Sequence, residues 1–463
     1  MQSNRNRSRK GRAALLAGFA LAVLFPGVAS GEPVTAFRHV NVVPMDREQV
    51  LRDQDVVVTG DAITAIGPNL HLPAEARVID AQGKYLSPGL ADMHSHSESR
   101  EDMKVYLANG VTTILNLGGA SATFVDQRVP LFNSGKRPGP HIYLALRIDG
   151  TPEYGQIVVK TPDEARAAVR LAKTNGYQFI KLYNNLSADA FVAVADEARR
   201  EGLGLTGHYV RAVTLAQQLQ SHDVLVAHLE ELMYALFTPP DQDPLAAPPD
   251  SVIATAAQTL KANRAFVVAD LFTFETIAAQ WGRPAVAAAY YTRPEAKFVP
   301  YEWRLDWMRE DYISKKGSLD PRATFEARLA KGLSDAGIPL LAGTDAPTIP
   351  GIYPGFSLHD DLDRLQAAGL TRFQALSAAT RTPGDYIQAT LHEPKKFGEV
   401  KAGYRADLVL TDRNPLDDLG VLRHPAGVMA GGHWYSQADL GAMLAQVEGD
   451  YRRAAAMGGA DKP

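Results

Sequence analysis

Histidine side chains in this chain stand where apolar, strand-like runs end. The segment DMHSH (92–96) closes the first such run, and His208 and His228 close two later, consecutive ones. Residues two apart in a strand face the same side, so His94 and His96 point the same way and can share one cation. A single strand-end histidine is more often packed or solvated than a metal ligand, but the ordered set favours a metal site.

Two further side chains end strand-like runs in a way that suits a metal. Asp345 follows the apolar residues of the last run, where an aspartate alone would be interpreted as the N-cap of the next helix. Lys181 shares a strand face with Phe179 and Tyr183, and if that face lines a barrel interior, burial lowers the lysine pKa. A neutral amine can take up carbon dioxide, and the two oxygens of the carbamate can bridge two divalent metals. The alternative is a lysine whose ammonium reaches solvent at the strand end, and the residues alone favour neither.

The elements that must position these residues alternate between strand-like and helical runs from Leu86 onward. Such alternation indicates parallel βαβ units, and eight of them indicate a closed α/β barrel of the (β/α)8 TIM type, which we assign to residues 86–385. Barrel enzymes place their chemistry at the carboxyl ends of these strands. The eight runs are LADMHSH (90–96), VTTILNL (111–117), HIYLALRI (141–148), YQFIKLY (177–183), LGLTGH (203–208), VLVAHLE (224–230), AFVVADLF (265–272) and PLLAGTDA (339–346).

Local signals mark the helices between these runs. Residues 161–164 (TPDE) form a capping box with proline at the first helical position, and Gly176 stands where that helix should stop. A second helix is predicted over 321–336 and a third from about Thr371.

Strand-like texture also flanks the barrel. Residues 34–85 contain a hairpin signal at Gly60-Asp61, and residues 386–440 contain ADLVLTD and VMAGGHWY. We expect these two segments to pair into a small β-sandwich-like domain outside the barrel. A C-terminal helix or tail follows over 441–463.

Two connections within the barrel are long. Residues 235–264 are rich in proline, and residues 276–320 are rich in tyrosine and tryptophan. Long connections inside a compact domain are often lids over a functional site. The alternative, slightly favoured for any one aromatic residue, is a packed helical insert.

The start of the chain has the pattern of a cleavable export signal. Basic residues precede the apolar stretch Ala13–Phe25, and small residues follow it. We therefore interpret residues 1–30 as a signal peptide and expect a secreted or periplasmic protein; the alternatives are a short membrane anchor or a buried helix. The 463 residues include no cysteine, so metal ligands must be histidine, carboxylate or modified side chains. A net charge of −4 gives no sign of nucleic-acid binding.

The ordered motifs resemble the metal-ligand pattern of the amidohydrolase superfamily. The matching parts are DMHSH, the strand of Lys181, His208, His228 and GTDAP (343–347). The segment FGEVKAGYRADLVLTDRNPLDDL (397–419) resembles the C-terminal signature of the imidazolonepropionase-like and prolidase-like members. The resemblance covers about residues 34–440.

This resemblance implies two divalent metals, zinc by default. His94, His96 and Asp345 would hold the more buried metal, and Lys181, as N6-carboxylysine, would bridge both metals together with a water or hydroxide. Asp345 would take the proton from the attacking hydroxide and pass it to the leaving group. The two ligands of the second metal would be His208 and His228.

Five other residues are weaker candidates for substrate binding. Tyr183 and Tyr209 follow predicted ligands directly. Arg147 ends the third strand and could pair with a substrate carboxylate or form a structural ion pair. Glu230 could bind a substrate amine or cap a helix. His359 lies in the loop after the eighth strand.

The sequence therefore predicts a metal-dependent hydrolase that cleaves an amide or peptide-like C–N bond, in an N-acyl amino acid or a dipeptide-like substrate, with a metal-bridging hydroxide. A lactone or ester hydrolase and a deaminase are alternatives, although deaminases of this fold usually need no carbamate and Lys181 counts against them. A non-catalytic barrel would lack one of the ligands. The expected partner is a small molecule, with no nucleic acid and no membrane after signal cleavage; a homo-oligomer stays open.

Overall fold

The computed structural model describes residues 32–221 and 224–458. The chain separates into two units, residues 1–32 and residues 33–463, and the fold described below is that of the second unit. The expected signal peptide, residues 1–30, lies outside the described residues. Among the helices that the structure describes, none combines the length and the apolar character needed to cross a bilayer.

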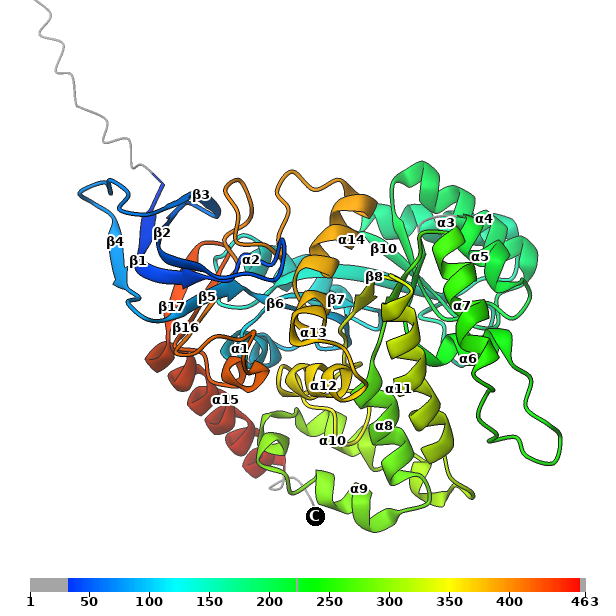
Figure 1. Cartoon of the computed structure of the whole chain (residues 1–463). Helices are drawn as coiled ribbons and strands as arrows, with labels where there is room; N and C mark the ends of the chain where they lie inside the picture. The colour runs from blue at the N-terminus through cyan, green and yellow to red at the C-terminus, as the bar shows by residue number, and fades with distance from the viewer. Residues whose placement is uncertain (1–31, 222–223, 459–463) are drawn as a thin grey trace, which may run out of the picture. The chain divides into compact units, whose positions relative to one another are not determined.

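A small sheet joins the two ends of the second unit (Figure 1). Its strand order is β17-β16-β15-β5-β1-β2-β3, with β4 paired to β1, and the N- and C-terminal segments meet where β15 runs antiparallel to β5. The predicted hairpin is present between β2 and β3, and Gly60 takes the left-handed conformation in its turn, with φ of 60°. The strands are β1 (Val34–Val42), β2 (Leu51–Thr59), β3 (Ala62–Gly67), β4 (Arg77–Asp80), β5 (Tyr85–Pro88), β15 (Leu408–Thr411), β16 (Gly427–Ala430) and β17 (His433–Ser436).

The second sheet is the barrel, and each of the eight predicted runs corresponds to one of its strands. Neighbouring strands are parallel, in the order β14-β13-β12-β11-β10-β8-β7-β6. The short strand β9 (Ile157–Val158) pairs with β8 outside this order. The barrel strands are β6 (Leu90–Ser95), β7 (Val111–Asn116), β8 (His141–Asp149), β10 (Phe179–Leu182), β11 (Gly204–Gly207), β12 (Val224–Val226), β13 (Phe266–Val268) and β14 (Leu340–Leu341).

Backbone contacts between the first and last strands close the barrel. The amide of Met93 donates to the carbonyl of Ala342 at 3.0 Å, and Ser95 forms a parallel bridge with Ala346. The expected fold class, a (β/α)8 barrel with a β unit built from both ends of the chain, is confirmed.

Side chains alternate between the inside and the outside of the barrel wall. In β10, Phe179 packs in the interior cluster, whereas Ile180 and Leu182 belong to the cluster that packs beneath the helices. Because alternate residues share a face, Lys181 lies on the interior side with Phe179. The sequence pattern had left open whether this face of the strand lines the barrel interior, and in the structure it does.

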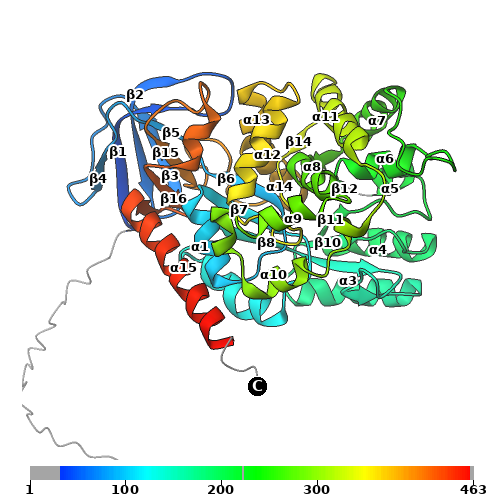
Figure 2. The same cartoon turned by 90° about the horizontal axis from the view of Figure 1, so that it is seen from below.

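Helices surround the barrel strands (Figure 2). The predicted capping box is present in α3, where the Thr161 hydroxyl accepts from the Glu164 amide at 3.3 Å. The predicted helices at 321–336 and after Thr371 correspond to α11 and α13. The helices are α1 (Arg100–Ala108), α2 (Val129–Asn133), α3 (Pro162–Thr174), α4 (Ala188–Glu201), α5 (Leu215–Ser221), α6 (Glu230–Leu236), α7 (Ser251–Ala262), α8 (Leu271–Gln280), α11 (Asp320–Asp335), α12 (Phe356–Ala367), α13 (Arg372–Ala378), α14 (Arg381–Leu391) and α15 (Gln437–Gly458), with a π-helical turn η1 (Phe124–Arg128) and a 3-10 turn η4 (Leu419–Arg423).

Residues 386–391 differ from the expectation that they belong to the small β unit. They form the second half of α14, and Tyr386 and Ile387 pack against Phe179 and Leu225 of the barrel interior. These two apolar residues are adjacent in sequence, so their pattern did not reveal a helical face.

The aromatic connection, which we call the insert (276–320), is helical. It contains the end of α8 and four short elements, and Trp307 and Tyr291 pack together in it with ring centroids 5.7 Å apart. The short elements are α9 (Pro284–Tyr290), η2 (Pro294–Phe298), α10 (Tyr301–Trp307) and η3 (Tyr312–Ser314).

Candidate metal centre

The four histidines singled out in the sequence converge at the carboxyl ends of the barrel strands. His94 lies in β6 and His96 directly after it, while His208 and His228 follow β11 and β12. The ring centroids of His94 and His96 are 5.4 Å apart, those of His94 and His228 4.3 Å, and those of His208 and His228 5.0 Å. Parallel strands bring their carboxyl ends to one rim, which places residues from distant parts of the chain side by side.

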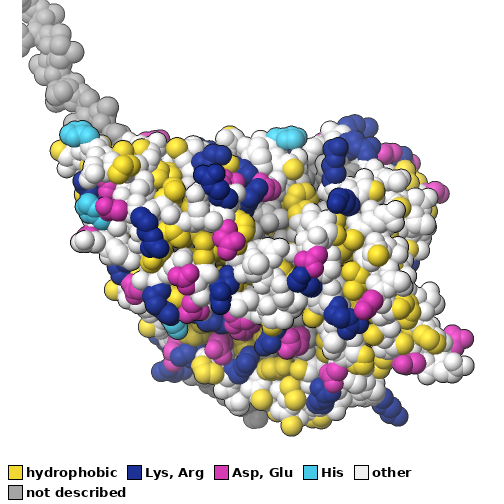
Figure 3. Space-filling model, viewed as in Figure 1, with side chains coloured by type: hydrophobic (Ala, Val, Ile, Leu, Met, Phe, Trp, Pro, Cys, Tyr) yellow, Lys and Arg dark blue, Asp and Glu magenta, His cyan; other side chains and the backbone are white. Residues whose placement is uncertain are grey.

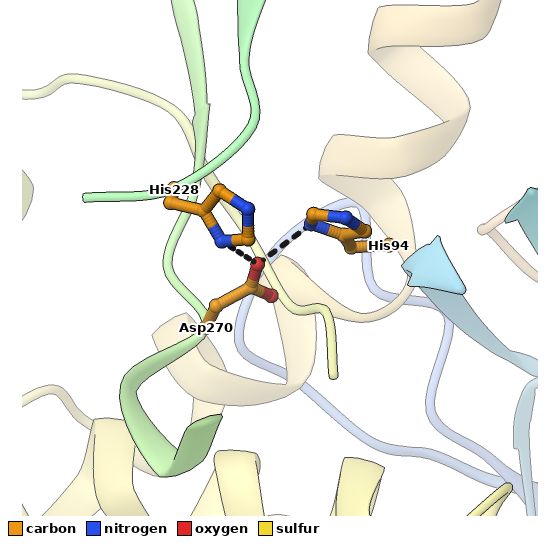
Figure 4. A group of neighbouring side chains, drawn as sticks. All are labelled: His94, His228 and Asp270. Carbon is orange, nitrogen blue, oxygen red and sulfur yellow. Dashed lines mark hydrogen bonds and ion pairs between the residues drawn. The ribbon is translucent and has the colours of Figure 1, made fainter. Parts of the chain in front are cut away.

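One carboxylate orients two of these rings (Figure 4). Asp270, which follows β13, accepts from Nδ1 of His94 at 2.9 Å and from Nδ1 of His228 at 2.8 Å. An imidazole that donates from Nδ1 carries its lone pair on Nε2, the atom that remains for a metal. Burial, first of all, and the neighbouring carboxylate of Asp361 raise the pKa of Asp270.

The other two rings are oriented in the same sense by different acceptors. Nδ1 of His96 donates to the carbonyl of Gly118 at 2.7 Å, and Nδ1 of His208 pairs with Glu231 at 2.5 Å. Nε2 of His208 is buried and has no hydrogen-bond partner among the described residues. In each of the four rings the engaged Nδ1 leaves the lone pair on Nε2.

Asp345 completes one side of this cluster. Its Oδ1 lies 3.1 Å from Nε2 of His96 and 3.5 Å from Nε2 of His94. Burial raises the pKa of Asp345, but His94 and His96 outweigh burial and hold that pKa well below its usual value. Asp345 and Asp270 both adopt a left-handed backbone, with φ of 57° and 46°, a conformation that is uncommon for residues other than glycine and is concentrated at functional sites.

Lys181 lies inside the barrel beside His94. Its side chain is 1% exposed, and Nζ is 3.1 Å from Nε2 of His94. Burial lowers the lysine pKa to about 8, so the neutral amine is populated near neutral pH. The alternative of an ammonium that reaches solvent does not hold in this structure.

The donor set fits divalent metals with nitrogen and oxygen ligands. Burial lowers the pKa of His94 and His228 well below the usual value and keeps them neutral, which is the form that binds metal. Two groups of three residues have donor atoms within 4.8 Å of one another: His94, His96 and Asp345, and His94, His228 and Asp270. The first group offers the Nε2 atoms of its two histidines, whereas the second uses Nδ1 atoms that are already hydrogen-bonded to Asp270.

Two of the candidate substrate residues border the cluster. The Tyr183 ring stacks on His208 with centroids 4.0 Å apart, and Nζ of Lys181 is 5.4 Å from the Tyr183 ring centre. The Arg147 guanidinium lies 5.8 Å from the same ring, and its Nε is buried without a hydrogen-bond partner among the described residues. Arg147 is therefore a cation at the cluster that no described carboxylate pairs with.

The other three candidates have different surroundings. The Tyr209 hydroxyl donates to the carbonyl of Val213 at 2.7 Å. His359 is buried in α12 and its Nε2 bonds the carbonyl of Asn109 at 2.9 Å, so its contacts lie between α12 and the end of α1 and not at the histidine cluster. Glu230 is half-buried at the start of α6 and makes no capping hydrogen bond.

Most of the chain superposes on solved amidohydrolase structures. The bottromycin amidohydrolase AH matches with a TM-score of 0.71 over 90% of each chain, at 23% sequence identity. The chain has the amidohydrolase fold. An Xaa-Pro dipeptidase with bound methionine (TM-score 0.63, 20% identity, 87% of this chain and 100% of that one) and the A. niger ochratoxinase (TM-score 0.63, 18% identity, 88% and 96%) share this amidohydrolase fold.

Sequence comparison gives shorter matches. A dihydroorotase from Halalkalibacterium halodurans is 27% identical over 186 residues, 40% of each chain, and an adenine deaminase from Listeria innocua is 39% identical over 70 residues, 14% of this chain and 12% of that one. The chain thus spans 40% or less of the length of these curated relatives, and no family model matches it. The resemblance to the amidohydrolase superfamily is confirmed through these comparisons and the fold.

Two residues of this amidohydrolase fold were not anticipated from the sequence. Asp270 ends the seventh strand-like run just as Asp345 ends the eighth, and this shared position was an available signal. Glu231, which holds His208 and accepts from the Tyr209 amide at 2.8 Å, had no such signal, because its role depends on how α6 begins.

Proposed function

We propose that this protein is a metal-dependent hydrolase of an amide or peptide-like C–N bond, with an N-acyl amino acid or a dipeptide-like compound as substrate. The observation that carries the proposal is the cluster of four histidine rings, each held through Nδ1, beside a buried lysine and Asp345. The shared fold with the bottromycin amidohydrolase and the Xaa-Pro dipeptidase supports the same bond class.

The residues that would hold the metals fall into two groups that share Lys181. His94, His96 and Asp345 surround one position, and His208 and His228 flank the other. Two divalent cations at such a site polarise a carbonyl and lower the pKa of water. The lysine would serve as N6-carboxylysine, because burial lowers the pKa of its amine to about 8 and so populates the neutral form that reacts with carbon dioxide.

The remaining chemistry falls to side chains of this chain. Asp345 is the proton carrier in the proposal: its carboxylate accepts a proton from the attacking water and returns it to the leaving nitrogen. Arg147 is the candidate anchor for a substrate carboxylate, because its charge is unpaired and planar guanidinium groups bind carboxylates in a bidentate manner. Tyr183, whose ring stacks on His208, would form the wall of the site between Arg147 and the histidine cluster.

Metal content tests the proposal directly. The purified protein, reconstituted with zinc and bicarbonate, should bind close to two equivalents by elemental analysis, and should then hydrolyse members of a panel of N-acyl amino acids and dipeptides. A preparation that never exceeds one equivalent would exclude the binuclear centre. Turnover of lactones or esters with no turnover of amides would show that the enzyme cleaves an ester C–O bond and not a C–N bond.

We also propose that the protein is exported and that residues 1–30 are removed. The support is the order of basic, apolar and small residues at the start of the sequence. N-terminal sequencing of protein recovered outside the cytoplasm should begin near Gly31. An intact residue 1 in that fraction would contradict the cleavage.

A further inference from the structure

A cavity of about 470 Å³ lies between the insert and the loop that follows β14. Its walls are mostly apolar, and they include three aromatic residues, Tyr291, Trp307 and Tyr312, with Pro350 on the side of the loop. At the cavity, Met308 and Ile313 are 71% and 43% exposed. Large apolar side chains exposed together commonly mark a binding surface.

The only acidic side chain among the lining residues is Glu310, and it has no cationic partner. Within the described residues, no lysine, arginine or histidine forms an ion pair with it, because the nearby cations are engaged elsewhere: Arg309 pairs with Asp306 at 2.7 Å and Lys315 with Asp311 at 2.5 Å. Burial and the neighbouring Asp311 raise the pKa of Glu310. A carboxylate in an apolar, aromatic wall would gain from a cation beside it.

Tyr312 links this cavity to the loop that carries Asp345. Its ring lines the cavity and also packs against the apolar cluster that contains Ala346, the residue after Asp345. Burial first, and then the carboxylates of Glu310, Asp345 and Glu230, raise the pKa of its phenol. The carboxylates of Glu310, at the cavity, and of Asp345 thus both act on the Tyr312 phenol.

We propose that this cavity binds the positively charged, apolar end of the substrate: a protonated or quaternary ammonium carried on an apolar body. Three aromatic walls and one unpaired carboxylate attract such a group, since ring faces and carboxylates both favour cations. The proposal rests on the proposed function, because it takes the ligand to be the substrate of the neighbouring centre. It narrows the substrate class to amides that bear an apolar amine.

Calorimetry on the metal-loaded protein tests the binding part without turnover. Protonated 2-phenylethylamine should bind at least about tenfold more tightly than its neutral counterpart, 2-phenylethanol. Glu310→Gln should remove this difference, whereas Glu302→Gln, an exposed carboxylate of the same insert, should keep it. Met308→Lys should also weaken amine binding, because its ammonium competes for Glu310 from an exposed position.

Kinetics then distinguish a substrate pocket from a site for a separate ligand. For two amides that differ only in a terminal amine or hydroxyl, Glu310→Gln should raise KM for the cationic amide by about tenfold and leave the neutral one unchanged. Equal binding of amine and alcohol would overturn the proposal even in an active hydrolase. Selective amine binding with an unchanged KM ratio would overturn the assignment to substrate.

Discussion

Lys181 and His94 meet nitrogen to nitrogen, 3.1 Å apart, in the interior of the barrel. Nδ1 of His94 donates to Asp270, so Nε2 is an acceptor and Lys181 is its donor. Such a pair is neutral or carries the single charge of the lysine, and burial disfavours that charge. The contact places the Lys181 amine beside the His94 atom proposed to bind metal, where a carbamate on that amine would supply the negative charge that two cations need.

The Lys181→Ala variant tests this interpretation. We expect activity to fall on the order of 10²-fold or more and metal content to fall with it, because both cations lose a shared ligand. Acetate or propionate should restore part of both in a saturable way, since a small carboxylate can occupy the space of the bridge. Activity assays and elemental analysis measure the two effects.

Three controls accompany this variant: chloride in place of the carboxylate, an arginine at position 181, and an alanine at an exposed lysine. Chloride at equal ionic strength should restore nothing, and Lys181→Arg should be inactive and not rescued, because a fixed positive charge fills the space. Lys173→Ala, at an exposed position of α3, should behave as the unaltered protein. If Lys181→Ala kept full activity and two bound metals, Lys181 would not be a metal ligand.

Asp345→Asn separates proton transfer from metal binding. An amide oxygen can still approach a cation but cannot accept and return a proton, so we expect a loss of roughly 10²–10⁴-fold in kcat with a substantial share of the metal retained. Steady-state kinetics and metal analysis on the same preparation provide the measurement. If turnover stays near normal, another residue is the base.

At the residue scale, the sequence could identify the polar residues at strand ends but not the residues that hydrogen-bond to the histidine rings. His94, His96, Lys181 and His228 were recognisable because strand ends meet on one rim of a barrel. The role of Asp270 depends on a contact with His94, 176 residues away, which arises only when the barrel is closed. Local sequence carries no record of such a contact.

At the scale of elements, the insert is tied to the loop of Asp345. The Trp307 indole is 2% exposed, and Nε1 donates to the carbonyl of Pro347 at 2.7 Å. Trp303, earlier in α10, is half-buried and packs at the edge of the same cluster. The two tryptophans therefore have unequal roles, although they are alike in sequence.

Trp307→Phe should keep the ring and lose the hydrogen bond to the loop. We expect kcat to fall roughly tenfold, because small displacements of a catalytic group are costly, together with a lower melting temperature. Trp303→Phe is the matched control and should change both quantities little. Equal effects of the two substitutions would mean that the hydrogen bond to Pro347 adds nothing beyond the packing of the ring.

The elements themselves were largely predictable, and the exceptions have a physical reason. Apolar runs bounded by turn residues revealed all eight barrel strands, since parallel strands are buried on both faces. The part of helix α14 at 386–391 was not predicted. Its buried residues pack against the barrel interior, and the residues that follow, 397–440, have a strand-like pattern. The insert was recognised by its length, but its cavity depends on how short helices pack.

At the scale of the whole second unit, the C-terminal helix is docked through a buried acid. Asp102 in α1 is fully buried, and one of its oxygens accepts from the Tyr451 hydroxyl of α15 at 3.2 Å. Its other oxygen has no hydrogen-bond partner among the described residues. On the face shown in Figure 3, basic and acidic side chains are interspersed, so this buried carboxylate differs from the solvated surface charge around it.

Burial raises the pKa of Asp102 from 3.8 to about 7, which sets the sign of a pH effect. An acid whose pKa is higher in the folded than in the unfolded state costs stability as the pH rises from the unfolded value through the folded one. Asp102→Asn removes this cost. The melting temperature of the variant minus that of the unaltered protein should therefore grow by roughly 2–6 °C between pH 5 and pH 8.

Calorimetric melting at the two pH values, with metal content held constant, measures this difference. Asp126→Asn, an exposed position near α1 in the sequence, is the matched control and should show no such growth with pH. A difference that stays the same at pH 5 and pH 8 would mean that Asp102 keeps its usual ionisation.

The closure of the barrel between β6 and β14 also determines the order of events during synthesis. His94 and Thr344 are in contact across 250 residues, and the Asp345 amide donates to the carbonyl of His94 at 2.8 Å. A nascent chain that has not yet reached β14 already contains every histidine of the cluster but lacks the strand that holds β6 in place. Contacts of such long range form slowly. We therefore expect any cation to be bound only after β14, at residues 340–341 of 463, has been synthesised.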